Sequence, residues 1–311
     1  MAATSASERP AAGELSEVGV FALLTLVWGT TWAAIRVALA GIPPLTGVAI
    51  RFALAGAVLL VVARARGVAL GRGRLERRLW WVNAATTFTG SYSLVYWAEQ
   101  WVPSGLAAVL FATFPIWVVL LGYVLLPGER VGAGRLAAVL LGFAGVAVIF
   151  SEDFAKLGGA DVRHAAAVLL AAPLLSALGS VCLRRWGSGI SPLSLAAIPM
   201  LLTGVGLGGV AAVVERGQPI SGALSPWLAT VYLSLFGSAL TFTLYFWLLA
   251  RRSALFSSLI SYTVPVVAVA VGWLFLDEPV TGRVLAGGAL VLAGVGLVVR
   301  GPQARPRRGG G

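Results

Sequence analysis

The amino-acid sequence predicts an all-α integral membrane protein with ten transmembrane helices, arranged as two inverted five-helix repeats. Three observations support this prediction: the composition, a duplication of about half the chain, and regularly recurring apolar segments. Of the 311 residues, 59% are hydrophobic and only 11% are charged, and the mean hydropathy is +0.91. Soluble domains carry far more charge, so we expect lipid to surround most of this chain.

The duplication relates two long stretches of the chain. The sequence from Tyr96 to Val146 is written again, with changes, from Phe246 to Val295, and an offset of 150 residues aligns Pro115 with Pro265. A unit this long is no solenoid repeat, so it is a duplicated half-molecule. We expect a disordered cytoplasmic tail over residues 1–17 and a basic cytoplasmic tail over residues 300–311. The first five-helix repeat is expected over residues 18–151 and the second, inverted repeat over residues 164–299.

The apolar segments have the length that a membrane helix needs. About 20 apolar residues cross the hydrocarbon of a bilayer at 1.5 Å of rise per residue. Such windows recur along the chain at 18–38, 45–63, 80–98, 104–126, 134–151, 164–184, 193–214, 227–249, 254–276 and 283–299. The connections between them are too short for another domain, and unpaired strands are untenable in lipid, which favours a helix bundle.

The positive charges indicate how these helices are oriented. If the amino terminus is cytoplasmic, the cytoplasmic segments hold most of the 23 Lys and Arg residues, including those of the loop 64–78. The opposite loops hold only Lys156, Arg163, Arg216 and Arg283. This bias predicts a multi-pass protein of the plasma (inner) membrane with both termini in the cytoplasm. Because each half has five helices, the second half crosses the bilayer in the opposite sense.

Inverted repeats are typical of carriers that expose a central site to each side in turn. A single cysteine, Cys182, and a single histidine, His164, leave no disulfide framework and argue against zinc or Ser-His-Asp chemistry. We therefore expect no enzyme activity, no metal and no cofactor. The net charge of +11 follows from the topology and does not indicate nucleic acid. A membrane scaffold or receptor remains the main alternative, ahead of an intramembrane enzyme or a channel.

Several motifs resemble one known family. WGTTWAAIRVAL at 28–39, an Arg-Phe pair at 51–52, AEQWVPSGLAAVLFATFP at 98–115, and GER and DEP turns at 128–130 and 277–279 resemble the EamA family of the drug/metabolite transporter superfamily. The resemblance covers residues 18–299. It implies ten helices, a lipid bilayer and a small-molecule substrate as partners, and export of metabolites, amino acids or drugs, with protons as the candidate coupling ion. A monomer or weak homodimer is expected. It also implies that the fifth and tenth helices pair, and both carry small residues every four positions (Ala138, Gly142, Ala289, Ala293).

Polar and aromatic residues near the middle of the predicted helices are candidates for substrate binding. Trp28 and Trp32 lie one turn apart and can stack on a solute, as Tyr92 and Tyr96 can hydrogen-bond one. A mid-helix proline frees a carbonyl and permits bending. The candidate substrate-binding residues are Trp28, Thr31, Trp32, Tyr92, Tyr96, Pro115, Ser180, Tyr245 and Pro265. The alternatives are anchoring at the membrane interface for the aromatic residues and static packing for the prolines.

Three charged residues fall inside the predicted spans, where charges are costly and often functional. Arg36, Arg51 and Glu99 lie at similar depth near the outer surface, so an ion pair or a network is expected there. Glu99 could bind a proton or a cationic substrate, and we treat the three as gating or coupling residues. The alternatives are that the arginines extend to lipid headgroups and that Glu99 interacts with the dipole of the following helix.

Overall fold

The computed structural model describes residues 16–129, 131–149, 151, 159–267 and 281–300, and every regular element in these ranges is a helix. The first repeat contains α1 (Glu17–Leu39), α2 (Pro44–Ala65), α3 (Arg74–Asn83), η1 (Ala84–Ser91), α4 (Tyr92–Ala98), α5 (Ser104–Phe111), α6 (Phe114–Leu125), η2 (Pro127–Glu129) and α7 (Ala133–Ile149). The second contains α9 (Ala160–Leu169), α10 (Ala171–Trp186), α11 (Pro192–Val214), α12 (Leu224–Ser234), η3 (Leu235–Leu240), α13 (Thr241–Arg251), α14 (Ala254–Ser258) and α16 (Gly282–Arg300). The DEP turn at 277–279 and nearly all of both expected tails lie outside the described residues.

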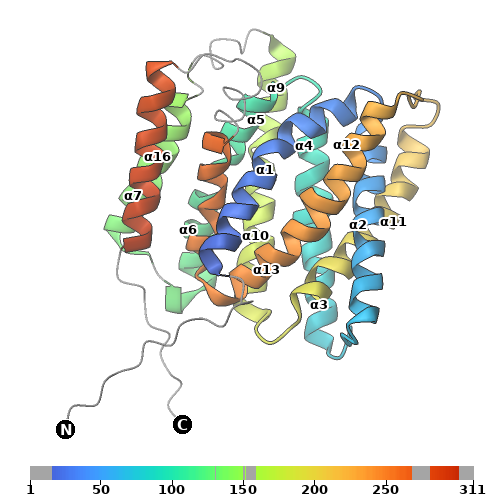
Figure 1. The fold of residues 1–311 in the computed structure, drawn as a ribbon, viewed down its shortest axis with the longest axis horizontal. Coiled ribbons are helices and arrows are strands. Elements are labelled where there is room, and N and C mark those ends of the chain that lie inside the picture. Colours follow the sequence, from blue (N-terminus) through green and yellow to red (C-terminus); the bar gives the residue numbers. More distant parts are fainter. Residues whose placement is uncertain (1–15, 130, 150, 152–158, 268–280, 301–311) are drawn as a thin grey trace.

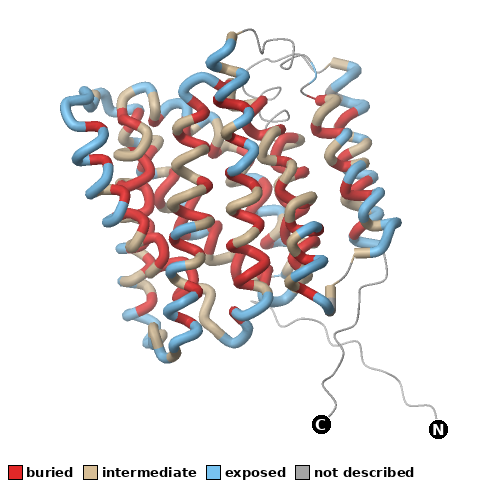
Figure 2. Tube along the Cα trace, turned by 180° about the vertical axis from the view of Figure 1, so that it is seen from behind, coloured by how far each residue is buried: buried red, intermediate tan, exposed pale blue. Residues whose placement is uncertain are grey.

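The helices stand side by side in a bundle (Figure 1). Six described helical segments are long and apolar enough to cross a membrane, and three shorter apolar helices accompany them. The outer faces remain apolar: Val124, Val205 and Val213 are each about three-quarters exposed. Buried residues gather inside the bundle, and exposed ones lie along its outside and at its ends (Figure 2). Apolar surface on this scale suits a lipid environment.

Small residues bring α2 and α11 into close contact, one helix from each repeat. A Cβ atom added to Gly56 would lie 2.7 Å from the backbone nitrogen of Leu201, and one added to Gly204 would lie 2.4 Å from that of Ala53. Only hydrogen atoms on these glycine Cα atoms leave room for the facing backbone. The pair joins the two repeats along one flank of the bundle (Figure 1).

A second pair, α7 and α16, joins the repeats on the opposite flank, where the two helices lie alongside each other (Figure 1). A Cβ on Gly145 would lie 2.6 Å from the carbonyl oxygen of Gly287, and one on Gly294 would lie 2.7 Å from that of Ala138. The expected pairing of the fifth and tenth helices is therefore confirmed. Gly142 takes part as predicted, since its Cα would lie 2.9 Å from a Cβ on Gly294.

Two π-helical turns interrupt otherwise α-helical segments, and the sequence did not predict them. They are η1 and η3, whose positions match under the 150-residue offset of the repeat. A π turn widens the helix and leaves carbonyl groups poorly paired, and such turns are frequent at functional sites. The helix containing η1 also begins at Arg74 rather than near residue 80, because its charged first turns do not register in an apolar window although they continue the helix.

The N-terminus of α2 is capped from the second repeat. Its N-cap residue is Pro43, which makes no side-chain cap. Instead the carboxylate of Glu215, which follows α11, accepts hydrogen bonds from the backbone nitrogens of Leu45 and Thr46, both at 2.8 Å, and from the hydroxyl of Thr46 at 2.7 Å. A carboxylate is the preferred acceptor at this positive end of a helix dipole.

Replacing Glu215 with glutamine is expected to lower the free energy of unfolding by about 1 to 3 kcal/mol, because a charge-assisted acceptor is lost while its donors on Leu45 and Thr46 stay partly buried. A lower melting temperature in detergent would show this. Glu17→Gln is the matched control, since Glu17 pairs with Arg252 while remaining 27% exposed, and such exposed pairs contribute about 0 to 1 kcal/mol. Equal melting temperatures for the two variants would contradict the prediction.

Candidate functional site

A cavity of about 90 Å³ lies between the two repeats. Its walls come from α1, η1, α4, α5 and α6 of the first repeat and from α10, α13, α14 and the helical residues after it in the second. Six of the nine predicted substrate-binding residues line it: Trp28, Thr31, Trp32, Tyr92, Ser180 and Tyr245. Most of the residues that were chosen for their depth along the predicted helices therefore lie around this one cavity.

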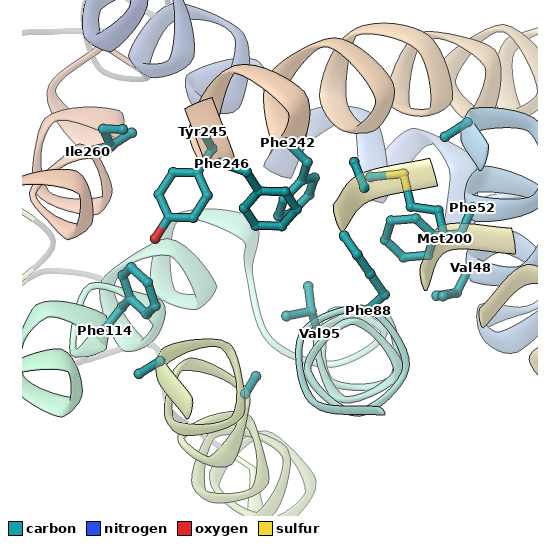
Figure 3. Close-up of a cluster of buried hydrophobic side chains, with 14 of the residues drawn as sticks. Val48, Phe52, Phe88, Val95, Phe114, Met200, Phe242, Tyr245, Phe246 and Ile260 are labelled. Carbon is teal, nitrogen blue, oxygen red and sulfur yellow. The ribbon is translucent and has the colours of Figure 1, made fainter. Parts of the chain in front are cut away.

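Aromatic rings form much of the cavity wall. The ring of Trp28 lies 5.4 Å from that of Phe242 and 5.5 Å from that of Tyr245, and Trp32 lies 5.6 Å from Phe111. Tyr245 and Phe242 project from α13 beside Phe114 and Phe88 (Figure 3). Rings at these separations and tilts stabilise one another and present large, rigid apolar faces to a solute.

Hydroxyl groups form the polar part of the wall. The Tyr245 hydroxyl donates to Ser180 at 3.1 Å, and the Ser176 hydroxyl donates to Ser91 at 2.9 Å. Ser258 and Ser261 donate to backbone carbonyls of their own helix at 2.7 and 2.9 Å. A hydroxyl that has used its proton in this way still offers lone pairs to a ligand.

One further hydroxyl at the cavity has no partner. The Thr87 Oγ1 in η1 is buried without a hydrogen bond, and buried polar atoms in native proteins are nearly always paired. This oxygen faces α10, where a Cβ added to Gly179 would lie 2.2 Å from it. Among the described residues that line the cavity, none carries a formal charge, so the wall suits a solute that needs aromatic contact and hydrogen bonds.

Several residues that line the cavity were not predicted from the sequence, among them Thr87, Ser176, Phe242, Ser257, Ser258 and Ser261. A signal for the serines was present. Ser257, Ser258 and Ser261 recur at helical spacing in an otherwise apolar segment, where serine has few partners other than backbone. Phe242 had no such signal, because a phenylalanine in a membrane helix faces lipid as readily as a cavity.

Tyr96, Pro115 and Pro265 do not line the cavity among the described residues. Tyr96 is buried behind the wall, where its hydroxyl accepts a hydrogen bond from Arg51 Nη1 at 3.4 Å. Pro115 is buried in the first turn of α6, and α5 and α6 form one apolar span, Ser104–Leu125, that is interrupted just before this proline. The interruption agrees with the prediction that a proline here permits bending. Phe114, the residue before Pro115, lines the cavity instead. Pro265 is also buried, and the residue before it, Val264, lines the cavity.

Arg51 is only 1% exposed, so it does not extend to headgroups and that alternative is wrong for Arg51, whereas it stays open for Arg36, which is exposed. Its Nε donates to Ser238 Oγ at 2.7 Å and its Nη2 donates to the carbonyl oxygen of Gly237 at 3.0 Å, both in η3. The guanidinium carbon lies 4.7 Å from the centre of the Tyr92 ring. Arg51 thus ties α2 of the first repeat to the π turn of the second, directly behind a cavity-lining ring.

Arg36 and Glu99 meet at the end of the bundle where α4 leads into α5, which we call the α4–α5 end (residues 99–103). Arg36 Nη1 donates to the backbone carbonyl of Glu99, and more weakly to that of Val102 at 3.5 Å. The Glu99 side chain is fully buried, and neither of its carboxylate oxygens has a hydrogen-bond partner. The expected group of charges exists, but the arginine binds the backbone of Glu99 and not its carboxylate.

The opposite end of the bundle, where α13 leads into α14, is tied across the repeats; we call it the α13–α14 end (residues 252–253). Glu129 accepts from Arg184 Nε and from the backbone nitrogen of Ala254 at 2.9 Å. Arg184 also donates to the carbonyls of Leu249 and Ala250 at 3.0 and 3.1 Å. Although Glu129 lies in the turn before α7, it caps the first turn of α14, in the other repeat.

Comparison with known proteins identifies the relatives of this chain. It is 32% identical over 308 residues to a probable terminal-alkyne amino-acid exporter of Streptantibioticus cattleyicolor, covering 93% of this chain and 95% of that one. It is 31% identical over 259 residues to the uncharacterized inner membrane transporter YedA of Escherichia coli, covering 82% and 81%. PagO of Salmonella typhimurium is 29% identical over 250 residues, covering 80% and 82%.

A solved crystal structure has the same fold, with a TM-score of 0.76 at 23% sequence identity, covering 90% of this chain and 95% of that one. The family profile of EamA-like transporters matches this chain twice, over residues 15–151 and 164–300. The two matches together take in nearly all of the bundle and both sides of the cavity. The chain thus belongs to the EamA-like transporter family.

Proposed function

We propose that this protein is a secondary transporter that moves a small amphipathic solute across the inner membrane by alternating access. One observation carries the proposal: a cavity with an aromatic and hydroxyl-bearing wall lies between the two copies of a duplicated sequence. In this proposal ten transmembrane helices form two inverted repeats, over residues 18–151 and 164–299. Rocking of one repeat against the other opens the cavity to each side in turn.

The proposed direction is export, with both termini in the cytoplasm. The distribution of positive charge supports this orientation, and the name of the Streptantibioticus relative supports export. An uncharged wall suits metabolites, amino acids or drugs whose charges stay near the polar ends of the cavity. Arg36, Arg51 and Glu99 are the proposed gating and coupling residues, with protons as the coupling ion.

Ligand stabilisation followed by counterflow tests the proposal. Purified protein is screened by melting temperature against amino acids, including terminal-alkyne amino acids, and against amphipathic drugs. Any stabilising compound is then measured in proteoliposomes loaded with the same compound, where a carrier gives transient accumulation of labelled substrate. A protein that is stabilised but gives no counterflow with any compound would favour the scaffold or receptor alternative.

Replacing Trp28 with alanine is expected to remove both the stabilisation and the counterflow, because its ring forms part of the cavity wall beside Phe242 and Tyr245. A loss of at least about tenfold in counterflow rate is expected, since a buried aromatic contact of this kind contributes on the order of 1 to 3 kcal/mol. Trp81→Ala is the matched control, since Trp81 is 64% exposed on α3. Equal rates for the two variants would show that the cavity is not the transport site.

A further inference from the structure

The carboxylate of Glu99 is the least satisfied buried group that the structure describes. Its side chain has no exposed surface and neither oxygen has a hydrogen-bond partner. A buried charge without a partner costs several kcal/mol, so native proteins rarely keep one. The group must therefore be neutral in this conformation, or be paired in another one.

Two guanidinium groups lie close enough to interact electrostatically with this carboxylate, yet both are engaged elsewhere. Arg36 donates to the backbone carbonyls of Glu99 and Val102. Arg51 donates to Ser238 Oγ and to the carbonyl of Gly237. Neither arginine forms a carboxylate pair among the described residues, although a carboxylate is the strongest partner that a guanidinium group can have.

Tyr96 connects the two groups. It lies one helical turn before Glu99, and its hydroxyl accepts from Arg51 Nη1 at 3.4 Å, a long and weak hydrogen bond. The third donor group of Arg51 is thus loosely held by Tyr96, on the helix that leads to Glu99, while the other two hold η3. A shift of the guanidinium group along Tyr96 would exchange its neutral acceptors, Ser238 Oγ and the carbonyl of Gly237, for the charged carboxylate of Glu99.

We propose that Glu99 is the proton-binding site of this transporter and that its charge decides which partner Arg51 takes. When Glu99 carries a proton, Arg51 remains on Gly237 and Ser238, as in this structure. When Glu99 loses the proton to water at the α4–α5 end, one residue from the exposed Gln100, its carboxylate draws Arg51 away from η3. Return of a proton from water reverses the exchange.

The exchange would reach the cavity through two side chains. The carbonyl of Gly237 accepts from Trp28 Nε1 at 3.4 Å as well as from Arg51, so a shift of η3 on release by Arg51 would move the acceptor of Trp28, a lining residue of the first repeat. The guanidinium group also packs over the ring of Tyr92, which lines the cavity. The inference rests on the proposed transport function, for which it supplies the link between proton and substrate.

Other groups that titrate or carry charge near Glu99 are few. Arg36 faces it from α1, Arg51 from α2 and Tyr96 from α4 itself. On α9, the ring of His164 packs against Trp97 at 6.0 Å, two residues before Glu99. The sequences of η1 and α5 contain no charged residue. Asp161 and Arg163 lie on the same helix α9 as His164, and His164 is the residue whose effect the experiment separates from that of Glu99.

Hydrogen-deuterium exchange of purified protein in nanodiscs tests the proposal without a known substrate. Wild-type protein is labelled at an acidic and at a mildly alkaline pH, with times scaled for the intrinsic pH dependence of exchange. Peptides covering η3 and the start of α13 are expected to exchange about tenfold faster at the alkaline pH, as loss of one or two hydrogen bonds implies. Equal exchange at both pH values would overturn the proposal.

Three variants separate the groups involved. Glu99→Gln, which imitates the protonated side chain, is expected to keep η3 protected at both pH values. Arg51→Lys, which cannot hold both acceptors of η3, is expected to exchange fast at both. His164→Gln is expected to keep the wild-type response. A pH response that survives in Glu99→Gln, or that disappears in His164→Gln, would refute the assignment to Glu99.

Infrared difference spectra of the wild-type protein between the same two pH values need no variant to fold. A carboxyl group without hydrogen bonds absorbs at the high-frequency end of its range, and such a band is expected at acidic pH only. Its absence at both pH values would overturn the proposal. If the protein performs counterflow but shows neither pH response, the role of Glu99 is refuted and the transport proposal stands. If counterflow fails while the pH responses are present, the transport proposal is refuted and the proton site at Glu99 stands.

Discussion

Replacing Gly204 with valine is expected to abolish the folded protein. A Cβ at this position would lie 2.4 Å from the backbone nitrogen and 2.6 Å from the Cα of Ala53. Both atoms belong to the backbone of α2, so no side chain can turn aside and the two helices must separate. Overpacking typically costs about 1 to 3 kcal/mol and more where backbone must move. Size-exclusion chromatography of a fluorescent fusion should show aggregated material and little monodisperse protein.

The same helix offers a matched control. Gly206 lies two residues further along α11, and a Cβ there would meet no atom within 4 Å. Gly206→Val introduces the same β-branched side chain with the same helix propensity and should remain monodisperse. If Gly204→Val eluted like Gly206→Val with a similar melting temperature, the close contact between α2 and α11 would not be what holds the repeats together on this flank.

Replacing Arg184 with alanine is expected to open the α13–α14 end of the bundle. Arg184 supplies hydrogen bonds to Glu129 and to the carbonyls of Leu249 and Ala250, so its loss leaves three acceptors without their donor. The reporter is Ser258→Cys, a buried residue of the cavity wall, in a Cys182→Ala background. Labelling of this cysteine by a polar maleimide should become about tenfold faster, as loss of one or two such bonds implies.

Arg185→Ala serves as the control for this experiment, because Arg185 is adjacent in sequence and exposed. It removes the same charge from the same helix end and should leave the labelling rate unchanged. Equal acceleration by both substitutions would indicate a general effect of charge at the membrane surface. No acceleration by either would mean that the contacts of Arg184 do not control access to the cavity.

Apolar helices in most of the predicted spans, and much of the cavity, could be predicted from the sequence because both depend on position along a helix axis. Residues at similar depth on different helices, such as Thr31, Ser180 and Tyr245, come together wherever the helices enclose a space. Depth is set by the rise per residue and needs only the ends of each span. The repeat added a second constraint, since it required equivalent helices on both sides of that space.

The direction in which a side chain faces was harder to predict. Tyr92 and Tyr96 differ by one turn, yet Tyr92 lines the cavity and Tyr96 contacts Arg51 behind it. Arg51 finds its partners in η3, far along the chain, and those acceptors are available because of a π turn that no sequence pattern announced. Glu129 likewise caps a helix of the other repeat. Such contacts depend on helix rotation, which apolar periodicity leaves open when every face is apolar.

The π turn at η3 is the kind of feature that one extra residue produces in an α-helix, because a π turn accommodates one residue more than an α turn. Deleting one residue between 235 and 240 would therefore restore a regular helix and leave the residues on either side near their present orientation, with Phe242 and Tyr245 still in the cavity wall. The backbone would change instead, because the carbonyl group of Gly237, which accepts from Arg51 and Trp28, would return to the regular hydrogen-bond pattern of the helix. A single lost codon would thus remove the acceptor that joins the two repeats at this point while sparing the aromatic wall.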